Sequence, residues 1–383
     1  MDFQHRWKII RELGSGGQGK VSVVLDKGKF TNMNHMPESI RQLSRISDST
    51  RDERFIEKFG DAVIDIVNRN DPSNQGALKV LHQPQDARDY EQAEERIKNE
   101  IEAMTNLTHP NLLKILESDN ESRWFVSQYH WRGTLERNLS LYKGDIARAL
   151  NAFRPLVEAV SLIHEKGYIH RDVKPQNIFL DSSFNLILGD FGIVFFTDPE
   201  HTRVSDTLGN VGSRDWMPGW AMGIRVEELE PSFDVFSLGK LLWSMISGQP
   251  LLQLWYYDRP NYNLEQLFPN NRFMKLINNL LSKCVVENKQ QCIPDARALL
   301  EEINKIQSVI EKNAYLIDST VQFCCMVCGI GKYVIKVNED AIDQRNFGIT
   351  PVSGHLMKIY SCDHCGNVQI FDFPNSGTPP AWR

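Results

Sequence analysis

Hydrophobic and polar positions predict a chain with a strand-rich first part and a helix-rich second part. Residues 7–26 read as strand, glycine turn and strand, because β-prone runs flank a glycine cluster. Further strands are predicted at "ALKVL", "NLLKIL" and "RWFVSQY", and "DYEQAEERIKNEIEAMTNL" is typical of a charged amphipathic helix. After "HWRGTLERN" the apolar repeat becomes helical and stays so to about residue 307. The pattern therefore indicates a small strand-rich lobe followed by a larger helical lobe.

Two segments do not fit this alternation. Residues 28–75 are mostly polar but contain apolar positions at helical spacing, and unstructured loops of this length are uncommon in compact domains. We expect a helical insert that packs on the small lobe, with a regulatory or partner-binding surface as the alternative. Beyond about residue 319, short β-prone runs with paired cysteines predict a separate small module, and residues 374–383 read as an irregular tail.

Composition places the 383-residue chain among ordinary globular proteins, with 41% hydrophobic and 24% charged residues. The formal net charge of −6 gives no global field that would favour nucleic acid or anionic lipid. Residues 1–14 lack a basic stretch followed by an apolar one, and no later run reaches about 18 apolar residues. We expect a cytoplasmic protein with no membrane partner.

The glycines at positions 14, 16 and 19 have G-x-G-x-x-G spacing between two predicted strands. Glycine lets backbone N–H groups approach phosphate oxygens closely, because no Cβ atom intervenes. A dinucleotide-binding motif would be followed by a helix, whereas "KVSVVLD" is strand-like. Taken alone, the motif fits a plain glycine hairpin about as well.

Oxygen-bearing and basic side chains cluster later, in "HRDVKPQN" and "LILGDFGI". A divalent ion that bridges phosphates needs ligands such as a carboxylate and an amide, and Asp190 and Asn177 supply these. Asp172 is then left to orient an attacking hydroxyl. Lys79 lies in the middle of a predicted strand, where a lone lysine more often faces solvent.

In this order, the glycine loop, "ALKV", "HPNLLKIL", "HRDVKPQN", "DFG" and "DVFSLGKLLWSMISG" resemble the eukaryotic-type serine/threonine protein kinases over roughly residues 7–307. The resemblance implies an α+β bilobal fold over residues 1–312. The small lobe would cover about residues 1–128 and the helical lobe about residues 131–312. ATP and Mg²⁺, with Mn²⁺ as an alternative, would be the cofactors, and proteins would be the substrates.

The resemblance also implies a role for each motif residue. Lys79 would contact the nucleotide phosphates and pair with a helix glutamate, for which we choose Glu100 over Glu94 and Glu95. Lys174, two residues after Asp172, would neutralise charge that builds on the transferred phosphoryl group, and its presence favours serine or threonine as the acceptor. The remaining nucleotide contacts would be Gly14, Gly16, Gly19, Val21, Ala77, the hinge Gln128–His130 and Phe179, with Ser127 as a small gatekeeper.

Other positions would support or regulate the site. His170, Phe191, Met104 and Ile115 match the apolar spine that joins the lobes, and Asp234 would hold the catalytic loop. Ser213 would bond Asp172 and Lys174. Arg171 would bind a phosphate on the activation loop, where the candidate acceptors are Thr197, Thr202, Ser205 and Thr207, with Ser205 or Thr207 preferred.

The chain departs from the family pattern after the activation loop. The glutamate of the family's "APE" motif falls on Trp220, and its arginine partner falls on Gln291 or Cys292. Replacing both partners of a buried pair can be nearly neutral, so we expect a rebuilt contact in which Trp220 packs and Arg297 could substitute. The departure leaves open a catalytically inactive scaffold that binds ATP and a partner. A small-molecule kinase of related fold is the other alternative.

Two C-x-x-C-G motifs lie in the predicted C-terminal module, residues 319–373. They supply four thiolates, the preferred tetrahedral set for structural zinc: Cys325, Cys328, Cys362 and Cys365. A redox C-x-x-C would sit at a helix start, a pattern that this segment lacks. Cys324 then reads as a spare thiol and His364 as adjacent or exposed. The module resembles a zinc ribbon for protein docking, and the absence of a basic stripe argues against nucleic acid.

Overall fold

The computed structural model describes residues 2–16, 19–29, 72–81, 98, 100–119, 123–191, 195–196, 214–222, 229–271, 273–315, 325, 327, 333–337 and 355–374. Several residues singled out from the sequence lie outside these ranges. They are the predicted insert helix, Glu94, Glu95, the four candidate phosphate acceptors, Ser213, Cys324 and Cys328.

The first lobe is built on a five-stranded antiparallel sheet in the order β1-β2-β3-β5-β4. Its strands are β1 (Trp7–Gly16), β2 (Gly19–Asp26), β3 (Gln75–Leu81), β4 (Ile115–Ser118) and β5 (Trp124–Gln128). The predicted strand at "NLLKIL" is only partly right, because Leu112 forms an isolated bridge to Leu188 and β4 begins at Ile115.

A short 3₁₀ helix, η1 (Asp2–His5), precedes the sheet. Phe3 and Trp7 are buried with Trp124 and Val126 of β5 in one apolar cluster. Arg6 is held beside them, with its guanidinium bonded to Asp26 at 2.7 Å and to Glu117 at 2.9 Å. The aromatic residues before and at the start of β1 thus close part of the small-lobe core.

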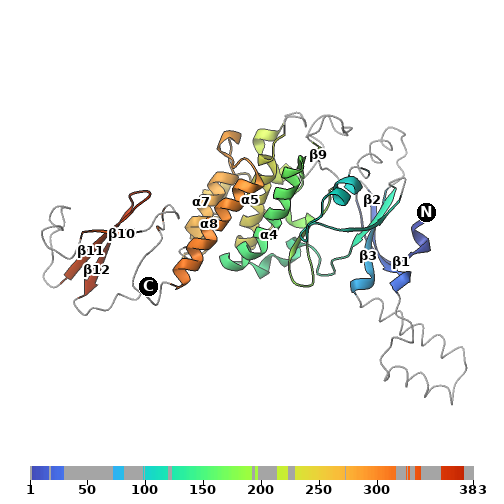
Figure 1. The fold of residues 1–383 in the computed structure, drawn as a ribbon, viewed down its shortest axis with the longest axis horizontal. Coiled ribbons are helices and arrows are strands. Elements are labelled where there is room, and N and C mark those ends of the chain that lie inside the picture. Colours follow the sequence, from blue (N-terminus) through green and yellow to red (C-terminus); the bar gives the residue numbers. More distant parts are fainter. Residues whose placement is uncertain are drawn as a thin grey trace, which may run out of the picture.

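The second lobe is helical and packs around α5 (Ser232–Ser247), whose residues are all buried. The neighbouring helices are α4 (Ile146–Glu165), α6 (Leu264–Leu267), α7 (Met274–Cys284) and α8 (Ala296–Tyr315). Figure 1 shows α4, α5, α7 and α8 gathered into one bundle, and contacts join α5 to both α4 and α7. Apolar residues of these helices, which predicted the helical lobe, are buried together in one hydrophobic core.

The described residues between α4 and α5 form short elements. They are β6 (Tyr168–Ile169), η6 (Pro175–Asn177), β7 (Ile178–Leu180), β8 (Leu186–Leu188), β9 (Phe195–Phe196), η8 (Arg214–Trp216) and η9 (Gly219–Ala221). β6 pairs with β9, and β7 pairs with β8. Before α4 lies η5 (Leu135–Leu141), and η11 (Tyr256–Asp258) and η12 (Lys289–Gln291) follow α5.

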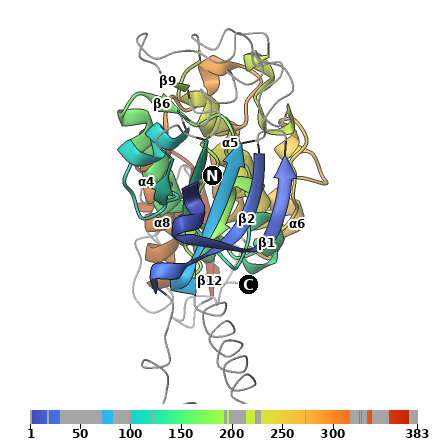
Figure 2. The same cartoon turned by 90° about the vertical axis from the view of Figure 1, so that its right-hand side faces the viewer.

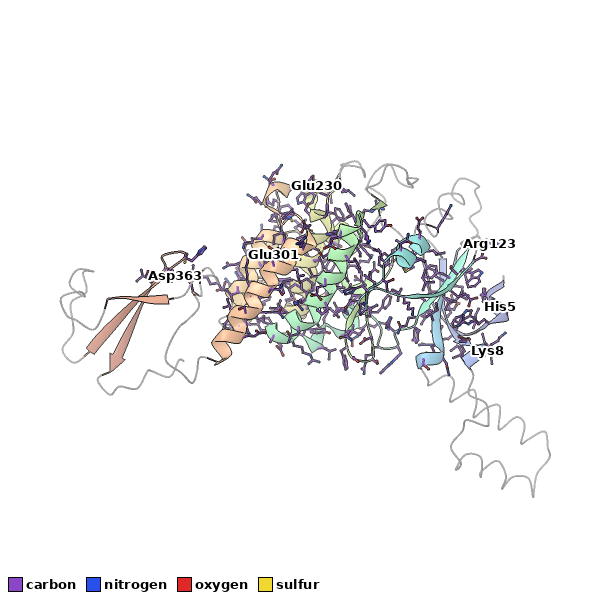
Figure 3. All side chains as sticks on the ribbon, in the orientation of Figure 1. His5, Lys8, Arg123, Glu230, Glu301 and Asp363 are labelled. Atoms are coloured by element: carbon purple, nitrogen blue, oxygen red, sulfur yellow. The ribbon has the colours of Figure 1, made fainter. Side chains whose placement is uncertain are left out.

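Side chains fill the space within the helical lobe, whereas Glu230 and Glu301 lie on its outside (Figure 3). In Figure 2 the small-lobe sheet lies in front of the helices, with β1, β2 and β3 side by side. None of the helices within the described ranges is long and apolar enough to cross a membrane.

A separate three-stranded antiparallel sheet follows α8 in sequence. Its strands are β10 (Tyr333–Val337), β11 (His355–Cys362) and β12 (Val368–Pro374), with β11 in the middle. The turn between β11 and β12 contains Gly366 at φ +73°, a left-handed conformation that favours glycine.

Candidate active site

Lys79 and Glu100 form the ion pair that joins the small-lobe sheet to the helix after it. Lys79 lies on β3, and Glu100 begins the helical residues 100–106. Lys79 Nζ is 2.7 Å from Glu100 Oε2 and 3.7 Å from Asp190 Oδ1. Burial opposes the charge on Lys79, but the two carboxylates outweigh it and raise the lysine's pKa. The lysine therefore stays cationic, and the solvent-facing alternative for it is wrong.

Glu100 is buried at 2% exposure. This burial raises its pKa above the usual value, although the neighbouring Lys79 acts in the opposite direction. A buried carboxylate is tolerated here because an ammonium lies within hydrogen-bond distance. The structure thus places the sequence-predicted glutamate beside its lysine.

A cavity of about 680 Å³ lies between the small-lobe sheet and the segment that follows β5, and neither Lys79 nor Glu100 is among its lining residues. Its lining includes predicted nucleotide contacts from both lobes: Val21, Ala77, Ser127, Gln128, His130 and Phe179. Within the described part of the chain, the three motif glycines do not line this cavity. They lie at the β1–β2 hairpin, where Gly14 faces Val21 and Gly16 faces Gly19.

Phe179, which lines the floor of the cavity, packs against Gly189. Phe179 stacks on His130 with ring centroids 6.1 Å apart. A Cβ atom added to Gly189 would lie 2.7 Å from Phe179 Cε2, which is too close for a real contact. The Phe179 ring in this position therefore requires glycine immediately before Asp190.

The catalytic-loop candidates converge on the carboxylate of Asp172. Lys174 Nζ and Asn177 Nδ2 each donate to Asp172 Oδ2 at 2.7 Å, and Asn177 also donates to the Asp172 carbonyl at 2.9 Å. Asp172 Oδ1 is buried without a hydrogen-bond partner among the described residues. One carboxylate oxygen is thus fixed by the protein, and the other remains to accept a proton donor.

Asp234 on α5 fixes the backbone just before Asp172. Its Oδ2 accepts from the N–H of His170 and its Oδ1 from the N–H of Arg171, both at 2.8 Å. Burial alone would raise the pKa of Asp234, but the hydrogen bond from His164 and the contacts of His170 hold that pKa below its usual value. Arg171 and Asp190 both adopt positive φ, at 67° and 58°. Backbone strain of this kind persists only where the surroundings enforce it.

His164 is a functional neighbour that the sequence did not reveal. Its Nδ1 accepts from the backbone N–H of Ala296 at 3.2 Å, so the ring proton lies on Nε2, which donates to Asp234 Oδ2 at 3.0 Å. One side chain thereby joins the end of α4 to the starts of α5 and α8. The only local signal was a histidine in the last turn of a helix.

The predicted apolar spine is assembled from distant segments. His170 and Phe191 meet edge to face with ring centroids 4.9 Å apart, and burial lowers the pKa of His170. Met104 and Phe191 belong to the main hydrophobic core, and Ile115 packs against it. These residues connect the helix carrying Glu100 with the loop carrying Asp172.

The described residues of the segment that departs from the family pattern, 214–222, pack against apolar neighbours. Trp220 packs beside Ile169, Met217 and Phe233 in a second cluster. Cys292 is buried, and its thiol lies 3.6 Å from the Ser232 carbonyl and 3.4 Å from the Cys284 carbonyl. Arg297 lies exposed on α8, so the structure gives no support to it as a substitute for the missing arginine.

A second cluster of chemistry-bearing side chains lies in the C-terminal sheet. The Sγ atoms of Cys325, Cys362 and Cys365 all lie within 4.8 Å of one another. Backbone N–H groups of Val327, His364 and Cys365 point at these sulfurs, each at 3.4 Å. The described residues thus bring together three of the four predicted ligands, and His364 is exposed.

Together, a bilobal fold, a buried lysine–glutamate pair and an Asp172–Lys174–Asn177 loop define a phosphoryl-transfer site of the protein kinase type. Comparison with known families agrees, since the model of the protein kinase domain matches residues 58–308. That range is well over half of the 383-residue chain. The chain belongs to the protein kinase family.

Three similar proteins come from Saccharomyces cerevisiae. "Serine/threonine-protein kinase KIN4" is 31% identical over 188 residues, which are 47% of this chain and 22% of that protein. "Fatty acyl-CoA synthetase and RNA processing-associated kinase 1" is 30% identical over 196 residues, 49% of this chain and 21% of that protein. "Probable serine/threonine-protein kinase KCC4" is 30% identical over 177 residues, which are 45% of this chain and 16% of that protein. The matched part is thus less than a quarter of each relative.

Proposed function

We propose that the protein transfers the γ-phosphoryl group of ATP to serine or threonine hydroxyls of protein substrates. The observation that carries this proposal is the state of Asp172. Its Oδ2 is held by Lys174 and Asn177, whereas its buried Oδ1 has no partner among the described residues. An acceptor hydroxyl that donates to Oδ1 would be oriented for attack in a fixed geometry.

The cavity and Lys79 support ATP as the phosphoryl donor. Apolar side chains from both lobes, Val21, Ala77 and Phe179, line the cavity where a flat base would be enclosed. Gln128, Tyr129 and His130 also line the cavity, where a hinge segment would meet the edge of the base. The cationic Lys79, oriented by Glu100, is placed for phosphate oxygens rather than for the base.

Asn177 and Asp190 are suited to hold Mg²⁺ with the nucleotide. The Asn177 amide nitrogen is engaged by Asp172, which leaves the amide oxygen as a ligand, and the Asp190 carboxylate is 43% exposed. An amide and a carboxylate oxygen fit the preference of this hard cation, and the phosphates would complete its coordination. Bound Mg²⁺ would neutralise charge on the phosphates, while these two residues would fix its place.

Serine or threonine as the acceptor follows from Lys174 and from the relatives. The ammonium of Lys174, 2.7 Å from Asp172, would offset negative charge on the transferred group. Two of the similar yeast proteins carry serine/threonine kinase in their names. Control of the site by phosphate bound at Arg171 remains a prediction, because the candidate acceptors lie outside the described residues.

The C-terminal sheet is proposed to bind one structural zinc ion through Cys325, Cys328, Cys362 and Cys365. Clustered sulfurs that receive backbone N–H donors are suited to thiolate ligands, because the donors stabilise negative charge on sulfur. Four thiolates would close the site and leave it no catalytic position. We propose that this module docks a protein partner. Residues 28–75 are a second candidate surface for such a partner.

Phosphoamino-acid analysis tests the proposed function. Purified protein incubated with Mg·ATP and histone, a generic basic acceptor, is expected to yield phosphoserine or phosphothreonine. Phosphotyrosine as the sole product would refute the assigned acceptor class. Label found only in small metabolites added to the reaction would refute protein phosphorylation.

A further inference from the structure

Lys240 is a buried cation in the middle of α5, a helix whose residues are all buried. Its exposed fraction is 0%, and its neighbours on α5 include the apolar Phe236 and Leu241 as well as Ser237 and Ser244, one turn away on either side. The ring centroids of Phe236 and Trp216 lie 5.5 and 5.9 Å from Nζ, within the range of cation–π contacts. An ammonium group in such a place costs folding free energy, so its presence calls for a compensating role.

The ammonium of Lys240 donates to the backbone carbonyl of Asp215, in η8. One turn earlier on α5, Ser237 Oγ donates to the carbonyl of Trp216 at 3.0 Å. Two side chains on one face of α5 therefore hold two successive carbonyls of the segment that precedes the helix. Hydrogen bonds from a charged donor are stronger than neutral ones, so Lys240 supplies the stronger of the two.

The held segment lies against the catalytic loop. Met217 and Ala221 share a hydrophobic cluster with Ile169, which is three residues before Asp172. A shift of residues 214–222 would therefore change the surface next to the catalytic carboxylate. In this part of the chain the family's ion pair is missing, since Trp220 occupies the glutamate position and Gln291 or Cys292 the arginine position.

We propose that Lys240 is a positioning residue for protein substrate, which holds residues 214–222 against the catalytic loop in place of the missing glutamate–arginine pair. The expected effect on protein substrate rests on the proposed kinase function, whereas the hold of Lys240 on residues 214–222 does not. Burial lowers the pKa of Lys240 to about 8, with the Asp215 charge opposing that shift. The ammonium thus remains mostly charged at neutral pH, as a charged donor requires.

Lys240→Met tests the proposal, because methionine fills similar space without the donor. Amide hydrogen exchange in residues 214–222 is expected to become at least about tenfold faster, with no change in residues 2–16. The KM for histone should rise about tenfold while the KM for ATP stays unchanged. Lys240→Arg, which keeps a cation, should restore part of both effects.

The matched control is Lys275→Met, which changes an exposed lysine on α7 and should alter neither quantity. Wild-type exchange together with a wild-type KM for histone in Lys240→Met would overturn the proposal. If that variant does not fold, Ser237→Ala tests the same segment. A smaller acceleration of hydrogen exchange in residues 214–222 by Ser237→Ala supports the proposal, and unchanged exchange overturns it. Hydrogen exchange needs no enzyme activity, so a protein that transfers no phosphate would refute the proposed function without deciding the role of Lys240.

Discussion

The ammonium of Lys79 lies 2.7 Å from the carboxylate of Glu100, although the two residues belong to a strand and a helix that the chain forms separately. The contact requires the helical residues 100–106 to pack toward β3. Since Met104 of the same helix lies in the core with Phe191, the pair and the apolar spine form together. The structure therefore brings the lysine–glutamate pair and the apolar spine together through one helix.

Single and double replacements of this pair should separate stability from activity. Lys79→Met leaves the Glu100 carboxylate buried without its partner and should destabilise the protein by about 3 to 5 kcal/mol. Lys79→Met combined with Glu100→Leu should recover most of that loss, because no buried charge is left. Both variants should lack phosphoryl transfer. Urea denaturation and a transfer assay measure the two effects, and a double variant no more stable than the single one would contradict this account.

The floor of the cavity offers a test of nucleotide binding. Gly189→Ala should weaken ATP binding, because the new methyl group would meet Phe179 and push its ring toward the base. Phe179→Leu removes the ring atoms concerned, so the double variant should bind ATP better than Gly189→Ala alone. Isothermal titration with Mg·ATP measures both. Equal affinities for Gly189→Ala and wild type would show that the base does not rest on this floor.

Lys240 gives the stability of the protein a specific dependence on pH. Burial lowers the pKa of its ammonium from 10.5 to about 8, so between these values the unfolded chain holds a proton that the folded chain has released. The contribution of Lys240 to stability therefore rises with pH in that window, by up to about 3 kcal/mol. At pH 7 the group is charged in both states and its burial cost is fully present.

The comparison with Lys240→Met isolates this effect. The free energy of unfolding, measured by urea titration between pH 7 and pH 9.5, should increase relative to the variant as pH rises above about 8. Lys275→Met, with its exposed position, should follow the wild type at every pH. A constant difference between wild type and Lys240→Met across the range would be inconsistent with a buried ammonium at this site.

Metal content tests the C-terminal cysteine cluster. The purified protein should contain one zinc ion per chain, and Cys362→Ser should lower this content strongly, because a serine hydroxyl is a poor replacement for a thiolate ligand. Elemental analysis by mass spectrometry measures both. Cys284→Ser is the matched control, since that thiol is buried in the helical lobe and burial raises its pKa well above the usual value. Wild-type protein free of zinc, with a Cys325–Cys365 disulfide instead, would contradict the zinc assignment.

Much of the fold could be predicted from the sequence because local patterns and motif order agree. The alternating runs at residues 7–26 became β1 and β2, and the helical repeat after residue 131 became the bundle around α5. Asp172, Asn177 and Asp190 could be named as candidates because their spacing is part of a motif, and their roles stay predictions. The beginning of β4 could not be predicted from the sequence, because Leu112 and Leu113 pair with Leu188, which is 75 or more residues away.

The residues that sequence reasoning missed act through contacts with no local signature. His164 bonds Ala296 across 132 residues, and Lys240 bonds the carbonyl of Asp215 across 25 residues. Neither bond follows from residue type or periodicity. On a helix whose residues are all buried, however, a lysine is itself a signal, because a buried ammonium needs a partner.

Transfer of labelled γ-phosphate from Mg·ATP is the measurement that tests the central claim most directly. The purified protein, histone and Mg·ATP are incubated, and label in both proteins is followed for wild type, Asp172→Asn and the exposed-site control Asp258→Asn. We expect transfer by wild type and the control, and a loss of at least about a hundredfold in Asp172→Asn, because its amide cannot take up a proton as the carboxylate can. Equal transfer by Asp172→Asn would contradict the assigned catalytic carboxylate. No transfer by the wild type, despite tight ATP binding, would indicate a binding-only scaffold.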